Sequence, residues 1–569
     1  MFNLIGKLNY IQIKKQIKKV SKKNLKRGLN LLDNYFITNL DGKIAVFDRT
    51  CDHQGGKIIS KDNKHICPIH NWEFFPERGL YNNGIIKKQK KFTIKKDQIF
   101  IEEKKSIPKI SNIKKNSEIK VRFFNHAFLQ ISTDEFKFAT DPWAIGPAFN
   151  SGWWLVHKTK KDWLDELNSC SFIYISHNHP DHLHPLTLSK IRKDIPIIVP
   201  NFVSDSVGNY MESLGFKNII RLDFQKEYQF KKTNLIISVL KSGDFREDSG
   251  IYFSIGKTTF LFDVDSNMIN FNRLPNVDIY ASSFAGGAGG YPLMFENYNE
   301  NDQRLILKKE KNLKRKKNEL RLTQIKPKYF IPYAGFFENK LSRDKRIKVL
   351  NQKNKIKDYE KLCKDLNIKL LNVENMDEYY FKNQLIINQG VNKNSYFNDI
   401  KPNDYLNYFK QNFKNIDNKY IKTYFKKSNF KDNLILKISL TDDNFKKSFL
   451  SFKVDFSKDK ISFNILKTIN DKNFFEKNKS IKYLYLKCRK ESFLSTIYNK
   501  SPWEDLLIGF QCKVLRHPNQ YNFKFWHHFT NFYIGQKNIR FSSDCSNCEK
   551  ISQFFDNKVY GSNSQKLGI

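Results

Sequence analysis

One run of nine residues, Ser-His-Asn-His-Pro-Asp-His-Leu-His at positions 176–184, holds four of the 12 histidines of the chain and an aspartate. It directly follows an apolar segment, residues 172–175, that has the composition of a buried strand. In α/β proteins, ligands bind where strands end in loops, and imidazole and carboxylate are common metal ligands. Histidines that only face solvent do not have to lie this close together in the sequence. The run therefore predicts a metal site at the end of a strand in an α/β domain.

The length of the chain indicates several domains. With 569 residues, of which 40% are hydrophobic, we expect two to four domains with separate cores. No apolar run approaches the roughly 20 residues of a membrane span. The N-terminus lacks the apolar region and the cleavage site of a signal peptide. We therefore expect a cytoplasmic enzyme without a membrane span.

The formal net charge of +41 allows two interpretations. It could indicate nucleic-acid or anionic-surface binding, or it could reflect a lysine-rich compositional bias. Lysine is scattered through every region, and no nucleic-acid motif accompanies the charge. We favour the bias and expect no specific nucleic-acid binding. A positive field would still attract an anionic substrate without specifying it.

Two short cysteine–histidine pairs lie in the first 105 residues, where strand-like runs alternate with Asp-Gly and Asn-Gly turns. They are Cys51-x-His53 and Cys67-x-x-His70. The pairs suit a Rieske [2Fe–2S] centre, in which two thiolates hold one iron and two imidazoles hold the other. A Cys2His2 zinc site has the same ligands. We favour the cluster because both loops lie between strands and because the Gln-Gly-Gly and Asn-Trp that follow resemble Rieske sequences.

The remaining chain divides into three parts. Residues 106–118 are polar and read as a linker. Residues 119–375 contain strands first in hairpins and then alternating with helices, which predicts a central αββα sandwich. One of these helices is lysine-rich, covers about residues 301–324 and has four possible core contacts, Leu305, Leu313, Leu320 and Ile325. Residues 376–569 are predicted to form a C-terminal α+β domain.

The spacing His-x-His-x-Asp-His resembles that of the metallo-β-lactamase superfamily, whose fold is the αββα sandwich. The resemblance implies that His177 and His179 bind a first metal and that Asp181 and His182 bind a second. It also implies a bridging aspartate after a later strand. Asp265 follows the apolar run 258–263 and is our candidate for that position.

The chain departs from that superfamily downstream. No histidine occurs between residues 185 and 516, so two expected ligands are missing. Asp244, and after it Asp248, are the candidates to replace the first, and nothing replaces the second near residues 332–335. A few histidines with carboxylates and open positions suit non-haem Fe(II) better than a dizinc hydrolase. His126 and His184 are either partners that orient the ligands or structural histidines, and the sequence leaves both possibilities open.

A Rieske domain followed by a metallo-β-lactamase-like domain is similar to the CMP-N-acetylneuraminate hydroxylase family. The stretches that carry the similarity include residues 141–149, 152–155, 174–177, 284–288, 333–336 and 508–511. The resemblance implies a monooxygenase with a [2Fe–2S] cluster and a mononuclear iron. Its substrate would be a CMP-sialate-type sugar nucleotide. Electrons would come from NAD(P)H through a reductase and cytochrome b5 or a ferredoxin.

Two other functions fit parts of the sequence. One is a metal-dependent phosphodiesterase or lactonase with an accessory Rieske domain, and the other is an electron-transfer or binding module without a second metal. The missing histidines speak against the hydrolase, and the intact run from His177 to His182 speaks against the metal-free module.

A glycine-rich stretch, residues 284–292, follows an expected strand. It could bring backbone N–H groups to an anion, or it could form a tight turn that needs positive φ.

Overall fold

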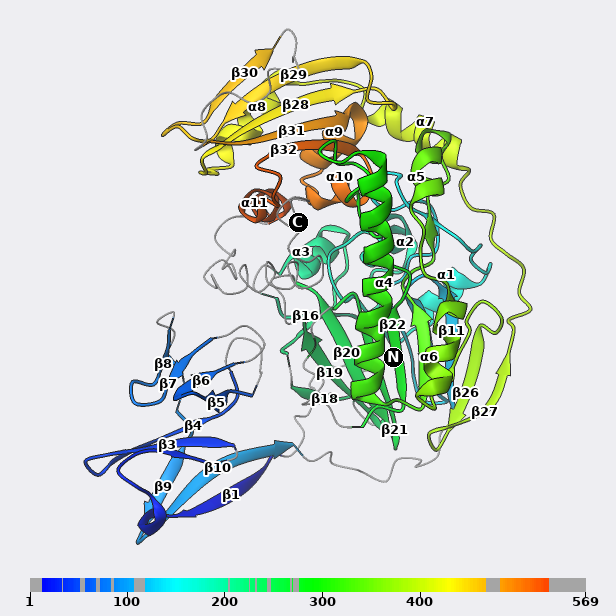
Figure 1. The fold of residues 1–569 in the computed structure, drawn as a ribbon. Helices are drawn as coiled ribbons and strands as arrows, with labels where there is room; N and C mark the ends of the chain where they lie inside the picture. Colours follow the sequence, from blue (N-terminus) through cyan, green and yellow to red (C-terminus); the bar gives the residue numbers. More distant parts are fainter. Residues whose placement is uncertain are drawn as a thin grey trace.

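The computed structural model describes residues 13–531 except 33, 52–56, 68–71, 83–85, 88, 107–117, 203–204, 225, 231–232, 243–246, 267–268, 270–275 and 467–480. Three bodies follow one another along the chain, each with its own sheets (Figure 1). The expected linker, residues 106–118, lies almost entirely outside the described residues. No helix in the described part of the chain is long and apolar enough to cross a membrane.

The N-terminal body is built from short antiparallel strands, as predicted. One sheet has the order β1 (Ile13–Ser21), β10 (Gln98–Ser106), β9 (Phe92–Lys95), and a second has the order β2 (Gly28–Leu31), β3 (Tyr35–Leu40), β4 (Lys43–Asp48). Two hairpins complete it, β5 (Ile59–Lys61) with β6 (Lys64–Ile66) and β7 (Phe74–Phe75) with β8 (Leu80–Tyr81). Its aromatic core surrounds Cys51 and Cys67, so both predicted cysteine ligands are buried.

The central body is a sandwich of two mixed sheets. The first has the order β17 (Ile219–Leu222), β16 (Ile197–Pro200), β15 (Phe172–Tyr174), β13 (Lys137–Thr140), β12 (Phe128–Ser132), β11 (Ile119–Asn125), β26 (Glu378–Lys382), β27 (Leu385–Gly390). The second has the order β18 (Glu227–Gln229), β19 (Leu235–Lys241), β20 (Ser249–Ile255), β21 (Thr258–Val264), β22 (Ile279–Ser283), β23 (Tyr329–Tyr333), β25 (Lys369–Leu370). Alternating apolar side chains from both sheets form one shared core.

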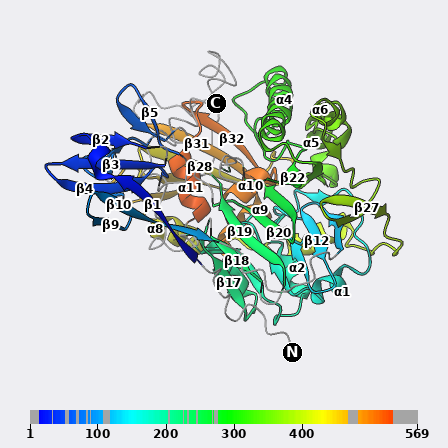
Figure 2. The same ribbon diagram turned by 90° about the horizontal axis from the view of Figure 1, so that it is seen from below.

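Helices cover both outer faces of this sandwich (Figure 2). Those on the first sheet are α1 (Trp163–Asn168), α2 (Pro185–Lys190) and α3 (Ser206–Ser213), and those on the second are α4 (Glu300–Ile325) and α6 (Glu360–Asp365). A shorter helix, α5 (Lys345–Leu350), packs near the two-stranded sheet of β14 (Trp154–Leu155) and β24 (Phe337–Glu338). The αββα prediction is therefore confirmed. The first sheet extends to residue 390, past the limit that we expected at 375.

Helix α4 begins and ends as predicted, but its inward face differs from the prediction. Asn299 caps it by accepting a hydrogen bond from the backbone of Asp302 at 3.0 Å. Leu305 and Leu320, which we expected in the core, are 60% and 61% exposed. Ile325 does pack against the core, as predicted. The helix buries Ile306, Leu307 and Leu322, and beside them the polar Asn318 and Arg321, because the sheet beneath presents polar partners there. A hydrophobic pattern cannot identify such a face.

The C-terminal body is an α+β domain, as predicted. Its sheet has the order β30 (Ser462–Leu466), β29 (Ser448–Asp455), β28 (Leu434–Thr441), β31 (Lys482–Arg489), β32 (Cys512–His517). Its helices are α7 (Pro402–Asn412), α8 (Asn418–Lys427), α9 (Lys490–Tyr498), α10 (Glu504–Ile508) and α11 (Phe523–Asn531). Aromatic side chains fill the core between sheet and helices, with Trp503 fully buried among them.

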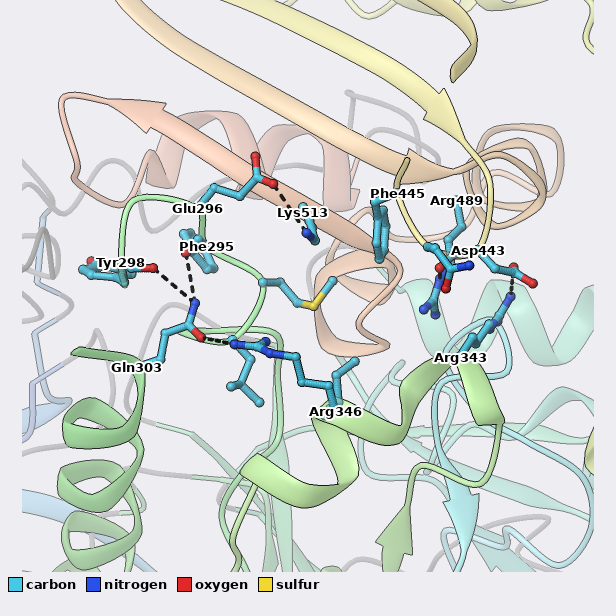
Figure 3. Close-up of a pocket in the computed structure, with 14 residues that line it drawn as sticks. Phe295, Glu296, Tyr298, Gln303, Arg343, Arg346, Asp443, Phe445, Arg489 and Lys513 are labelled. Atoms are coloured by element: carbon cyan, nitrogen blue, oxygen red, sulfur yellow. Dashed lines mark hydrogen bonds and ion pairs between the residues drawn. The ribbon is translucent and has the colours of Figure 1, made fainter. Parts of the chain in front are cut away.

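The central and C-terminal bodies share an interface of apolar and charged groups. Phe295 of the central body pairs by its backbone with Val514 in β32, and its ring lies in the C-terminal core. Arg343 donates to the Asp443 carboxylate at 2.7 Å beside a pocket of about 320 Å³ that both bodies line (Figure 3). These contacts fix the C-terminal body against the sandwich.

We predict that one buried ion pair contributes strongly to this interface. Arg489 Nη2 lies 2.8 Å from Asp344 Oδ1, and both side chains are at most 2% exposed. Arg489→Met would leave the carboxylate buried without its partner, which typically costs about 3–5 kcal/mol. Urea unfolding followed by tryptophan fluorescence should show this loss. Arg304→Met, which removes an exposed pair with Glu300, should leave the midpoint nearly unchanged. Equal shifts in both variants would contradict the prediction.

Candidate metal centre

The predicted metal ligands lie at one edge of the sandwich. The run 176–184 follows the carboxyl end of β15, and Asp265 follows the end of β21 in the facing sheet. A third carboxylate, Asp141, follows β13, which is parallel to β15. Because the carboxyl ends of parallel strands point to the same edge, loops far apart in the sequence meet there.

His177, His179 and Asp265 form a first group of donor atoms, all within 4.8 Å of one another. His177 Nε2 and His179 Nδ1 are 2.9 Å apart, so the two rings turn a nitrogen toward the same point. His177 is fully buried, whereas the Asp265 side chain is 33% exposed. The group therefore has one open side.

His126, Asp181 and His182 form a second group, and all three are buried. Asp181 Oδ2 lies 3.1 Å from His126 Nε2 and 3.3 Å from His182 Nε2. Asp265 Oδ2 is 3.7 Å from His182 Nε2, so this carboxylate lies against both groups. That is the location expected of the bridging aspartate, and the structure brings together five of the six predicted residues of the central site.

His126 is the residue that the sequence analysis did not place among the ligands. It lies in the tight turn between β11 and β12 with φ of +43°, and its carbonyl accepts a hydrogen bond from Ala334 N at 2.8 Å. Ala334 belongs to the loop after β23 where the expected histidine is missing from the sequence. His126, from the turn between β11 and β12, therefore lies beside the loop in which the expected histidine is missing. An unexplained histidine between two predicted strands was the available signal.

Asp141 holds the cluster from behind. Its carboxylate accepts hydrogen bonds from Ser176 N at 2.7 Å, from Ser176 Oγ at 2.6 Å and from His182 Nδ1 at 3.1 Å. Ser176 Oγ in turn lies 2.9 Å from His177 Nδ1. Hydrogen bonds at Nδ1 leave Nε2 of both histidines directed at the centre, where a metal would need a lone pair.

The C-terminal body contributes a carboxylate to the same site. Glu504, at the start of α10, places Oε2 3.7 Å from His179 Nε2, on the side of the ring away from His177. Burial opposes protonation of His179, but Glu504, Asp248 and Asp181 outweigh it and raise the pKa to about 9. The Glu504 carboxylate favours a proton on Nε2, so a metal in the first group would have to displace only the proton on Nδ1.

The charges of the centre favour a cation. Burial opposes protonation of His182, yet the carboxylates of Asp181, Asp141 and Asp265 raise its pKa well above the usual value. Burial, together with His182 and His179, lowers the pKa of His177 well below its usual value. Within the described chain, two buried ligand atoms, His182 Nε2 and Asp181 Oδ1, have no hydrogen-bond partner. Unpaired donor atoms between several carboxylates fit a bound metal.

His184 has a structural role. Its Nδ1 accepts from Thr187 N at 3.2 Å and caps α2, and its Nε2 lies 3.2 Å from the carbonyl of Pro147. Both ring nitrogens of His184 therefore have partners within the protein.

Asp244, our candidate for a replacement ligand, lies outside the described residues, whereas Asp248 is described and buried. In the N-terminal body, His53 and His70 also lie outside them.

Comparisons with known proteins agree with both motifs. The model of the Rieske [2Fe-2S] domain matches residues 12–91, which confirms the Rieske prediction over a zinc site. The cytidine monophosphate-N-acetylneuraminic acid hydroxylase of Danio rerio is 28% identical over 563 residues, covering 89% of this chain and 92% of the relative. The protein of that name from Xenopus laevis is 29% identical, covering 89% and 91%. The family resemblance seen in the sequence is confirmed.

Solved structures give a weaker match. CmlA, a diiron beta-hydroxylase from Streptomyces venezuelae, is 13% identical with a TM-score of 0.31, covering 47% of this chain and 54% of that protein. A score this low supports no argument about function.

We predict that Glu504→Gln weakens metal binding in the central site. The amide keeps the size of the side chain but removes the charge that orients His179. Loss of such an outer partner typically costs about 10–100-fold in metal affinity. Competition with a chelator, followed by iron analysis, measures the change. Glu360→Gln, an exposed change on α6, is the matched control. Equal iron retention in the two variants would refute a role for Glu504.

Proposed function

The chain is related over 89% of its length to cytidine monophosphate-N-acetylneuraminic acid hydroxylases, and on this premise we propose that it is a monooxygenase of CMP-N-acetylneuraminate or a related nucleotide-activated nonulosonate. The reaction converts a methyl C–H of the N-acetyl group into C–OH. One atom of O₂ enters the product, and two electrons with two protons convert the other to water. The observation that carries the proposal is the combination of a Rieske domain with a cluster of histidines and carboxylates in one chain.

Each centre has its own set of residues. We propose that Cys51, His53, Cys67 and His70 hold the [2Fe–2S] cluster, which passes electrons singly. In the central body, the proposed iron ligands are His177, His179, Asp181, His182 and Asp265, with His126 added by the geometry and Asp244 retained from the sequence. Iron held by these residues would supply the activation of O₂.

The protein's own groups prepare this site for that chemistry. Asp141 and Glu504 orient the imidazoles from behind, so the ligand nitrogens are fixed before a metal binds. His126 and His182 are buried and keep bulk water from one side of the site, whereas Asp265 leaves another side open. The open side suits the entry of a substrate methyl group.

Partners and compartment follow from the family resemblance. We propose that NAD(P)H supplies electrons through a reductase and cytochrome b5 or a ferredoxin, in the cytoplasm. The names of the relatives favour this hydroxylase over a metal-dependent hydrolase with an accessory Rieske domain.

The proposed activity has a direct test. Anaerobic protein reduced with dithionite should give the rhombic EPR signal of a Rieske cluster, and metal analysis should find at least one iron beyond the cluster. CMP-N-acetylneuraminate, a reductase system and ¹⁸O₂ should yield a product with one labelled oxygen. Label that enters only from H₂¹⁸O would indicate hydrolysis and reject the monooxygenase.

Two variants should separate the two centres. Cys51→Ser removes a cluster ligand, so the EPR signal should disappear together with turnover. His179→Ala should keep the EPR signal but lower turnover by more than the about 10–100-fold expected for an outer partner. Full activity in His179→Ala would place the reaction at another site.

A further inference from the structure

The glycine-rich loop after β22 lies at the same edge of the sandwich as the metal centre. Three of its glycines, Gly286, Gly287 and Gly289, have φ of +72°, +70° and +130°, so the predicted positive φ is confirmed. A Cβ on Gly287 would come within 2.6 Å of Asn351 Oδ1, which excludes a side chain there. At these three glycines, no side chain of the loop itself covers the backbone.

Three carbonyl groups of this loop accept hydrogen bonds from the rest of the protein. The Tyr359 hydroxyl donates to Phe284 O at 2.8 Å, Asn354 N donates to Ala285 O at 2.8 Å, and Asn351 Nδ2 donates to Gly287 O at 2.9 Å. Among the described residues, the N–H groups of positions 286–289 donate no hydrogen bond. A row of such donors is a typical binding surface for an anion.

Two lysines flank the loop. The Cβ and Cγ of Lys314 on α4 lie 3.6 and 3.7 Å from a Cβ built on Gly286, and the Cγ of Lys353 lies 3.2 Å from one built on Gly287. Lys314 Nζ donates to Ser283 Oγ at 2.6 Å, and Lys353 Nζ donates to the carbonyl of Phe337. Within the described chain, neither ammonium has a carboxylate within 4.0 Å.

Both lysines are partly buried, whereas many other lysines of this basic chain are exposed. Burial, together with Arg321, lowers the pKa of Lys314 to about 8, although Asp265 and Asp263 oppose the change. Burial lowers the pKa of Lys353 well below its usual value. A cation that loses water without gaining a counter-charge is unfavourable, so an anion beside it would be stabilised.

These groups are close to the metal centre. The charge of Asp265, a proposed iron ligand, acts on Lys314 and opposes the lowering of its pKa. Lys353 Nζ lies 3.0 Å from the centroid of the Phe337 ring, and that ring is 6.1 Å from the ring of His126. A ligand group held by the loop would therefore lie beside the site of the reaction.

We propose that the loop 286–289, with Lys314 and Lys353, binds a carboxylate or phosphate group of the molecule that reacts at the metal centre. The inference rests on the proposed function, in which the substrate carries both groups. Four backbone donors and two ammonium groups match the several acceptor oxygens of such an anion. The loop would thereby hold the substrate at a fixed distance from the iron.

Equilibrium dialysis with two probes tests the proposal. CMP carries the phosphate without the sialate carboxylate, and N-acetylneuraminate carries the carboxylate without the phosphate. Lys314→Met should weaken one probe by about 10-fold or more, because a charge-assisted hydrogen bond is lost. Loss of CMP binding assigns the phosphate to the loop, and loss of N-acetylneuraminate binding assigns the carboxylate. Lys314→Arg should restore most of the affinity.

Two further variants separate the site from general charge and from misfolding. Lys309→Met removes an exposed lysine from the same helix and should change neither affinity by more than about twofold. Gly287→Ala leaves the charge unchanged but strains the loop, and it should weaken the same probe as Lys314→Met. Iron content and the EPR signal should match the parent protein in every variant.

The proposal is overturned if the parent protein binds neither probe, if Lys314→Met and Gly287→Ala both bind as the parent does, or if Lys309→Met loses as much affinity as Lys314→Met. Failure of the proposed function looks different. A protein that does not hydroxylate CMP-N-acetylneuraminate, yet binds a probe through Lys314, retains the anion site. If the parent protein hydroxylates CMP-N-acetylneuraminate but Lys314→Met and Gly287→Ala both bind the probes as the parent does, the proposed function holds and the anion site is rejected.

Discussion

The buried carboxylate of Asp141 is the interaction on which the histidine cluster depends. It binds the backbone and the hydroxyl of Ser176, and it binds His182 directly. One side chain thereby orients His182 and, through Ser176, His177. Since imidazoles bind metal only through a correctly directed nitrogen, this carboxylate converts a histidine-rich loop into a centre with fixed donor atoms.

Several elements outside the histidine run complete the centre. The β11–β12 turn supplies His126, the end of β21 supplies Asp265, and the C-terminal body supplies Glu504. The last contact depends on the interface that Arg489 and Asp344 stabilise. The C-terminal body is therefore part of the site, because its position determines whether His179 has a carboxylate partner.

The sequence predicted what is encoded locally. The run 176–184, its strand and the aspartate after β21 were found because ligand spacing and strand patterns are short-range signals. Asp141, His126 and Glu504 lie far from that run in sequence, and they meet it only after the sheets form. The inward polar face of α4 was missed for a related reason. Its partners are on strands, so helical periodicity alone assigned Leu305 and Leu320 to the core.

The distribution of charge links substrate and metal. The chain carries a net charge of +41, yet the centre gathers the carboxylates of Asp141, Asp181, Asp265 and Glu504. An anion near these groups would be repelled until cations offset them, and at close range the Coulomb energy outweighs the diffuse field of surface lysines. In the proposed function, bound metal would supply part of that positive charge, and the lysines beside the glycine loop would supply the rest. Metal and anionic substrate should therefore strengthen each other's binding, since a coupling between two sites acts equally in both directions.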